Sequence, residues 1–201
     1  MATMAIHITG DADADQVLTD SPFALLVGMM LDQQYPMEHA FRGPHKVLTR
    51  FGSIEPGDIA AADPEEFARL CTTPPAIHRY GGSMAARLQA LATQVVSEYD
   101  GHAERIWTDA ATGKELLARV MALPGFGRQK AQIFVTLLAK QLGVRPEGWA
   151  EVVGDYAQDG YRSVADVTDP ASLQKVRDFK KAKKAAAKAA EAGAPADVQA
   201  G

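Results

Sequence analysis

Hydrophobic residues recur every three or four positions through most of this chain, and that period is the feature that most limits its fold. Residues 84–99 give the clearest case, since their apolar side chains fall on one stripe of a helix. The stripe consists of Met84, Leu88, Leu91, Val95 and Tyr99. No segment shows sustained alternation of apolar and polar residues, so the sequence predicts an all-α protein. Residues 4–10 are expected to be a short strand or an extended arm.

Capping signals mark where several helices should begin. A capping side chain is followed directly by proline at Ser21–Pro22, Asp63–Pro64 and Asp169–Pro170. Glu66 is expected to complete a capping box with Asp63. Glycine and proline breaks separate the helices, as in "FRGP", "YGG" and "GVRPEG".

Residues 123–131, "LPGFGRQKA", connect two predicted helices by a tight turn. Pro124 ends the first helix, and Gly125 and Gly127 permit the positive φ angles that such a turn needs. The second helix is expected to begin at Arg128, with its first N–H groups unpaired and pointing out of the helix end.

That helix end could hold a phosphate group, because the glycines leave the backbone open to an anion. Leu123 and Phe126 are expected to fix the hairpin to the core. A tight turn between two packed helices would need the same residues, so the hairpin alone leaves both interpretations open.

The charge of the chain is unevenly distributed. Residues 175–190 carry seven Lys or Arg and one Asp, a net charge of +6, which leaves −10 for the rest from the total of −4. A basic segment on an acidic protein suggests affinity for a polyanion, and a solubilising tail is the alternative. Residues 180–201 are rich in Lys and Ala, so we expect a mobile tail that is helical in part.

Several classes of protein are excluded or disfavoured. The single cysteine, Cys71, excludes an intramolecular disulfide and a four-cysteine metal or iron–sulfur site. The five histidines show no metal-ligand spacing. No apolar run is long enough to span a bilayer, and the first residues lack the pattern of a secretory signal. A cytoplasmic monomer without cofactors is the expectation.

Three segments, in this order, resemble the helix-hairpin-helix (HhH-GPD) DNA glycosylase superfamily, which includes endonuclease III and the adenine, oxoguanine and alkylpurine glycosylases. They are residues 24–41 ("ALLVGMMLDQQYPMEHAF"), residues 74–101 ("PPAIHRYGG" to "YDG") and residues 116–140 ("LLARVMALPGFGRQKAQIFVTLLAK"). The resemblance covers roughly residues 21–143 and is endonuclease III-like, without the iron–sulfur cluster.

The resemblance implies two helical subdomains that flank a cleft. Residues 21–143 would form one subdomain, with the helix-hairpin-helix motif at about 115–140. Residues 1–20 and 144–179 would form the second, followed by the tail. The hairpin of such proteins binds DNA phosphates, often with a monovalent cation at its carbonyls, here those of Leu123 and Gly125. The damaged base is flipped into the cleft.

The resemblance also implies which residue decides the chemistry. Bifunctional members carry a lysine two residues after the second hairpin glycine, and that lysine attacks the sugar. Counting from Gly127, this position holds Gln129, and Lys130 follows it. One residue turns a helix by about 100°, so Lys130 is expected to point elsewhere, to a phosphate or to solvent. Lyase activity is therefore not expected.

The catalytic aspartate of the family lies about 18 to 20 residues after that lysine position. Glu147 fits this spacing in a loop before the next helix, and Asp155 is the second candidate. A carboxylate there would stabilise the cationic sugar and orient a water molecule. Asp32 is a third candidate, because it would face the same cleft. Glu147 could also be a surface residue of a protein that has lost activity.

Other residues are expected to contact DNA. Gln33 and Gln34 occupy the position of the wedge that fills the gap left by a flipped base, and an exposed helix end is the alternative. The hairpin residues complete the set: Gly125, Phe126, Gly127, Arg128, Gln129 and Lys130.

The resulting hypothesis is a monofunctional DNA glycosylase of base excision repair that acts on double-stranded DNA. The alternatives are a catalytically inactive DNA-binding protein on the same fold and an all-α interaction module.

Overall fold

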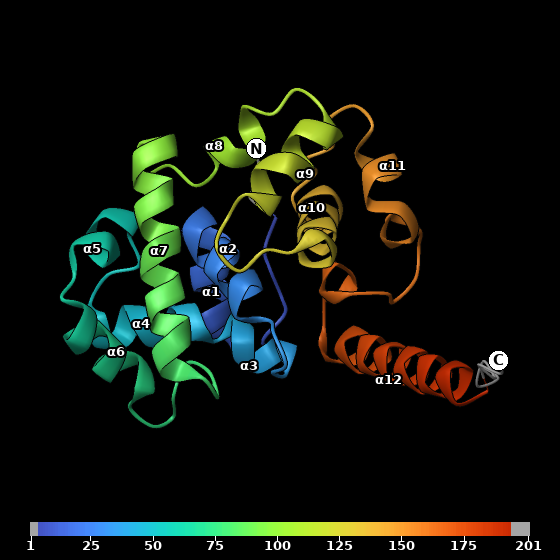
Figure 1. The fold of residues 1–201 in the computed structure, drawn as a ribbon, viewed down its shortest axis with the longest axis horizontal. Helices are drawn as coiled ribbons and strands as arrows, with labels where there is room; N and C mark the ends of the chain where they lie inside the picture. The colour runs from blue at the N-terminus through green and yellow to red at the C-terminus, as the bar shows by residue number, and fades with distance from the viewer. Residues whose placement is uncertain (1–3, 194–201) are drawn as a thin grey trace, which may run out of the picture.

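A computed structural model describes residues 4–193, and these residues are predominantly helical (Figure 1). The first α-helices are α1 (Ala12–Asp20), α2 (Pro22–Leu31), α3 (Met37–Phe41), α4 (Gly43–Phe51), α5 (Pro56–Ala61), α6 (Pro64–Thr72) and α7 (Gly81–Tyr99). They are followed by α8 (Arg105–Thr108), α9 (Gly113–Met121), α10 (Arg128–Gln141), α11 (Trp149–Val153) and α12 (Pro170–Ala192). Two short 3-10 helices are η1 (Gly154–Ala157) and η2 (Val164–Asp166). No strand occurs within residues 4–193, so the all-α prediction is confirmed.

The helices form two groups on either side of α1 to α3 (Figure 1). On one side α5 and α6 pack against the long helix α7, and α4 packs against α6. On the other side α9, α10 and α11 pack together. The central helix α2 contacts α1, α3, α4 and α7. The domain boundaries expected from the sequence remain a prediction.

The three capped helix starts are where the sequence predicts them. Ser21, Asp63 and Asp169 each accept a backbone N–H of the first turn, with proline next in the chain. The capping box at Glu66 is wrong: its carboxylate lies 3.6 Å from the Arg69 guanidinium instead of returning to the Asp63 amide. An exposed glutamate can form an ion pair with an arginine one turn away, and this ion pair competes with the capping hydrogen bond.

The N-terminal residues that follow Met4 form an extended arm rather than a strand. The buried carboxylate of Asp15 in α1 accepts the backbone amides of Ile8 and Thr9 and the hydroxyl of Thr9. These hydrogen bonds satisfy backbone amides of the arm that would otherwise pair with a neighbouring strand, so the arm is stable without a sheet.

The core beside the hairpin is aromatic. Phe134 of α10 is fully buried and meets the rings of Trp107 and Phe126 edge to face, each with a centroid separation of 5.9 Å. Leu123 and Phe126 are 3% and 5% exposed, which confirms that they fix the hairpin to the core.

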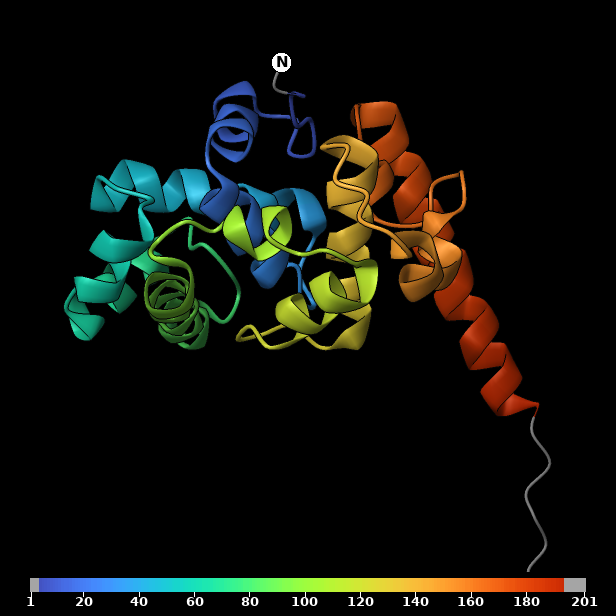
Figure 2. The same ribbon diagram turned by 90° about the horizontal axis from the view of Figure 1, so that it is seen from above.

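The last helix, α12, continues without a break to Ala192 and extends away from the body of the protein (Figure 2). The segment expected to be a mobile tail is thus helical as far as this residue, and its mobility remains a prediction. Residues 194–201 of that segment lie outside the described part of the chain. Within the described part, no helix combines the length and the apolar character needed to cross a bilayer.

The start of α9 packs closely against the loop before α11 at Gly113. A Cβ atom on Gly113 would lie 2.5 Å from Cα of Trp149, and the Gly113 amide donates to the Glu147 carbonyl at 2.7 Å. G113A should therefore lower the free energy of unfolding by about 1–3 kcal/mol, measured by urea denaturation.

The matched control is G82A in the first turn of α7. A Cβ atom on Gly82 meets nothing within 4 Å, so this change should leave stability equal or slightly higher. Equal stability of both variants would contradict the close packing at Gly113.

Candidate active site

The hairpin between α9 and α10 has a backbone that only glycine fits. Gly125 has a φ of +82°, and a Cβ atom there would lie 2.7 Å from Cδ of Arg87 and 3.1 Å from Cγ of Met30. Gly125 therefore combines left-handed backbone with close approach to α2 and α7. The positive φ predicted for Gly125 is confirmed, whereas that predicted for Gly127 is wrong: Gly127 has a φ of −78°, the extended backbone of a helix N-cap residue.

The start of α10 is open to a ligand. Gly127 is the N-cap residue and supplies no side chain, and a Cβ atom on it would meet nothing within 4 Å. Arg128 and Gln129, the first residues of the helix, are exposed. The N–H groups of this first turn have no side-chain cap, and the helix dipole favours an anion at this end.

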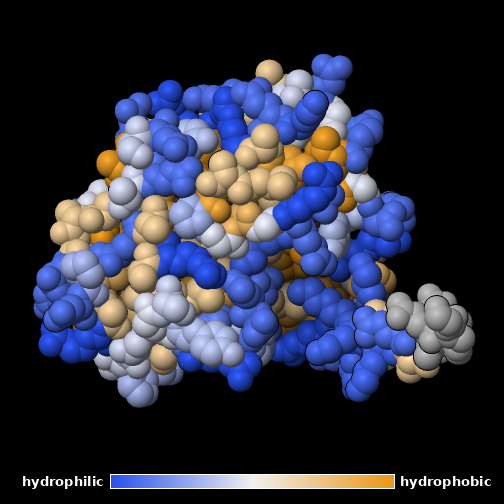
Figure 3. All heavy atoms as spheres, viewed as in Figure 1, coloured by the Kyte–Doolittle hydropathy of each residue, from blue (hydrophilic) through white to orange (hydrophobic). Residues whose placement is uncertain are grey.

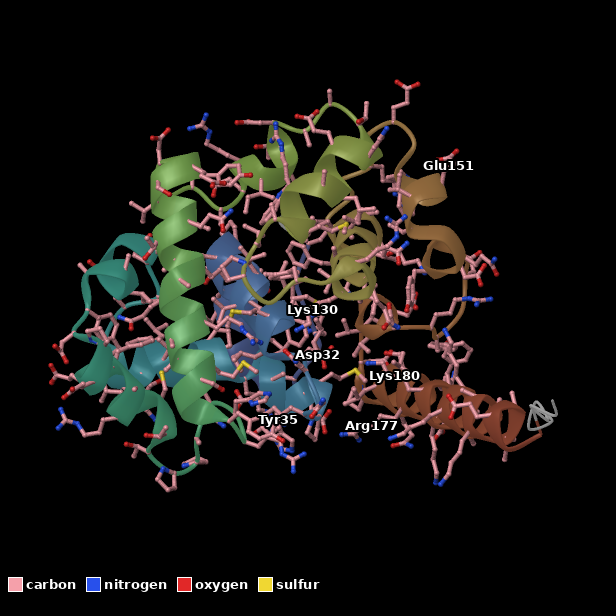
Figure 4. All side chains as sticks on the ribbon, in the orientation of Figure 1. Asp32, Tyr35, Lys130, Glu151, Arg177 and Lys180 are labelled. Carbon is pink, nitrogen blue, oxygen red and sulfur yellow. The ribbon has the colours of Figure 1, made fainter. Side chains whose placement is uncertain are left out.

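A cavity of about 500 Å³ lies beside this helix end, within the size range of small-molecule sites. The C-terminal end of α2 and the turn after it contribute Met29, Asp32, Gln34 and Tyr35. The hairpin helix contributes Gln129, Lys130 and Ile133. Figure 4 shows Asp32, Tyr35 and Lys130 gathered in this region, with Lys180 of α12 facing them.

The opposite wall of the cavity comes from the C-terminal part of the chain. Tyr156 of η1, Arg162 and five residues of α12 line it. The α12 residues are Phe179, Lys180, Lys183, Lys184 and Ala187. Hydrophilic side chains cover the visible face of α12 in Figure 3, beside a recess where apolar atoms are exposed.

The contribution of α12 to the cavity was not predicted from the sequence. Residues 180, 183, 184 and 187 follow the spacing of one helical face, and that spacing was the available signal. Their lysine and alanine side chains did not mark the face as a cavity wall, because charge runs usually indicate a solvated surface.

Asp32 is the carboxylate inside this cavity. It follows the last residue of α2, and its side chain is partly buried. Burial raises the pKa of the Asp32 carboxyl, while the positive charges of Lys180, Lys130 and His78 oppose that shift. The three cations favour the ionised form of Asp32, which is the form that can stabilise positive charge on a substrate.

Lys130 also faces the cavity. Its ammonium group donates to the Met30 carbonyl at 2.8 Å and lies 6.0 Å from the centre of the Phe126 ring. The pKa of Lys130 is lowered to about 8, because burial outweighs the opposing effect of the Asp32 carboxylate and the neighbouring Arg87 acts in the same direction as burial. Its contact with DNA remains a prediction.

Gln129 and Lys130 are adjacent in the sequence, yet both line the same cavity. The Gln129 amide donates to the Tyr156 hydroxyl at 2.9 Å, so it joins α10 to η1. Lys130 instead reaches the end of α2. The helical rotation between them directs the two side chains to different walls, as predicted, but that both walls belong to one cavity was not predicted.

The two glutamines after α2 are both exposed but have different partners. Gln33 accepts a hydrogen bond from Arg87 at 2.8 Å, and its carbonyl lies 3.0 Å from Nε2 of His78. Gln34 has a φ of +51° and lines the cavity. Of the pair, Gln34 is thus placed at the cavity, and the wedge role remains a prediction for both.

Glu147 and Asp155 lie elsewhere. Glu147 is exposed and lies beside the start of α9, where its carbonyl accepts from Gly113. The hairpin follows the other end of α9, and nine helical residues span about 13 Å. Asp155 is exposed in η1 and lines a smaller adjacent hollow that shares Tyr156 and Phe179 with the cavity. Glu151, between the two, lies far from Asp32 and Lys130 (Figure 4).

The monovalent cation that the resemblance implies at the hairpin carbonyls remains a prediction. The Leu123 carbonyl accepts the Phe126 amide at 3.2 Å, and a carbonyl has a second lone pair. A cation bound to Leu123 and Gly125 would add positive charge beside a phosphate. Separately, no group of three or more His, Cys, Asp or Glu side chains within residues 4–193 is arranged to hold a metal ion.

Comparison with known families agrees with this geometry. The family model described as "HhH-GPD superfamily base excision DNA repair protein" matches residues 27–195, which include the hairpin, the cavity residues and α12. No curated protein and no solved structure gives a significant match. Because the family model spans most of the chain, the protein belongs to the HhH-GPD superfamily of base excision DNA repair proteins.

Proposed function

We propose that the protein is a monofunctional DNA glycosylase that hydrolyses the bond between a damaged base and its sugar in double-stranded DNA. The observation that carries this proposal is the Asp32 carboxylate, which lines the cavity next to the hairpin helix. Membership of a base excision repair family supports the same reaction class.

The hairpin would bind the DNA backbone. The first N–H groups of α10, the open surface at Gly127 and the Arg128 guanidinium together form a site for one phosphate. A base inside a duplex cannot reach Asp32, so the nucleotide must rotate out of the stack and into the cavity. Gln34 would occupy the gap that the base leaves.

Asp32 would act on the sugar. As the bond between C1′ and the base nitrogen breaks, its electron pair leaves with the base and positive charge develops on the sugar. The Asp32 carboxylate stabilises that charge and orients a water molecule. The water oxygen then bonds to C1′, and a water proton is transferred to the departing base.

The residues at the hairpin favour hydrolysis over strand cleavage. The amide of Gln129 cannot form an imine with the sugar. The ammonium group of Lys130 donates a hydrogen bond to the Met30 carbonyl, which holds it at the end of α2. A protonated amine has no lone pair with which to attack C1′.

D32N should lower the rate of base release by about 10²- to 10³-fold while duplex affinity stays the same. The amide keeps the shape of the side chain and removes its charge. Single-turnover release from a duplex with one damaged base, alongside binding by fluorescence anisotropy, measures both quantities.

E147Q and D155N are the matched controls, since they remove a carboxylate from the two positions outside the cavity. Both should retain most of the activity. Loss of release in E147Q with retention in D32N would place catalysis at Glu147. Duplex binding by the wild-type protein without release of any base from alkylated, deaminated and oxidised substrates would support the inactive DNA-binding alternative.

Sodium borohydride should trap no covalent complex between the protein and a duplex that contains a damaged base or an abasic site. Borohydride reduces an imine to a stable amine, so trapping reports attack by a lysine. The assay is read as a shifted band on a denaturing gel. A cross-link that disappears in K130M would show lyase chemistry at Lys130 and refute the monofunctional assignment.

A further inference from the structure

The charges that line the cavity indicate which class of base it accepts. Besides the single carboxylate of Asp32, five basic residues line it. They are Lys130, Arg162, Lys180, Lys183 and Lys184. The cavity is therefore strongly positive around one negative group, although the chain as a whole has a net charge of −4.

The aromatic walls reinforce this charge distribution. The electron-rich face of an aromatic ring attracts cations, so Tyr156 and Phe179 alone would favour a positively charged base. In this protein the Lys183 ammonium lies 5.9 Å from the Tyr156 ring centre, and the Arg162 guanidinium lies 5.9 Å from that of Phe179. Cations of the protein itself therefore lie beside both rings and would repel a positively charged base.

The chemistry of the leaving base distinguishes two kinds of damage. An alkylated purine that carries a positive charge becomes neutral when its glycosidic bond breaks. A neutral base, such as a deaminated or oxidised one, takes the electron pair of the bond and departs as an anion. Nearby ammonium groups stabilise the anion in the second case and repel the substrate in the first.

We propose that the enzyme is selective for neutral damaged bases that leave as anions, and that Lys130 and Lys180 stabilise the departing base while Asp32 stabilises the sugar. This inference rests on the proposed glycosylase function. The positive groups at the Asp32 end of the cavity would then stabilise the negative charge of the departing base.

The test compares base release from matched duplexes that contain uracil, hypoxanthine or 8-oxoguanine with release from duplexes that contain 7-methylguanine or 3-methyladenine. At least one neutral base should be released at least about 10-fold faster, relative to its spontaneous loss, than both cationic purines. Preferential release of a cationic purine would overturn the selectivity and leave the glycosylase function intact. Release of no base at all would overturn both.

Adjacent lysines of α12 provide a matched pair of variants. Lys180 lines the cavity and Lys181 does not, yet K180Q and K181Q remove the same charge from the same helix. K180Q should slow release of the neutral base about 10-fold, and K181Q should not. Equal slowing in both variants would mean that the lysines act only through general attraction to DNA, which would contradict the role of Lys180.

The pH profile tests Lys130 directly. The charged and titratable groups beside Lys130 on other elements are Asp32, His78 and Arg87. Because the pKa of Lys130 is about 8, its positive charge is present at lower pH and is lost as the pH rises. Release of the neutral base should therefore fall between about pH 7 and about pH 9. K130R stays charged and should remove this decline, while K130M should slow release about 10²-fold throughout. A wild-type decline that persists unchanged in K130R would overturn the role of Lys130.

Discussion

The docking of the hairpin on the C-terminal end of α2 determines where the cavity forms. Gly125 packs tightly against Met30 and Arg87, where a Cβ atom would lie 3.1 Å from Cγ of Met30 and 2.7 Å from Cδ of Arg87, and Lys130 donates to the Met30 carbonyl. These contacts join segments 100 residues apart in the sequence. They bring the residue that follows α2, Asp32, to the first turn of α10, where the proposed phosphate site and the proposed catalytic carboxylate become neighbours.

The same junction explains why its charged groups are perturbed. Burial opposes the charge of both Asp32 and Lys130, and each group partly stabilises the charged form of the other. The helix α12 closes the cavity from the opposite side. Its Arg177 pairs with the buried Glu38 of α3, so a helix at the end of the chain is connected to the central helices α1 to α3. The positive cavity wall therefore depends on contacts that are distant in sequence.

Local features of the fold could be predicted from the sequence. The capped helix starts, the positive φ of Gly125 and the burial of Leu123 and Phe126 depend on neighbouring residues and on helical period, and the structure confirms them. The composition of the cavity could not be predicted in the same way. Gln129 and Lys130 face one cavity because α2 and η1 stand on different sides of α10, and no spacing within the hairpin encodes that arrangement. Counting residues placed Glu147 in the expected loop, yet this loop lies at the end of α9 away from the hairpin.

The central claim is that Asp32 is the carboxylate that faces the sugar of the flipped nucleotide. A crystal structure of the protein with a duplex that carries a non-cleavable, positively charged sugar analogue would test it most directly. The account predicts an Asp32 oxygen about 3–3.5 Å from the analogue's charged centre, or joined to it through one water molecule. The account would be contradicted by a complex in which the analogue lies beside Glu147 or Asp155 and Asp32 contacts only protein.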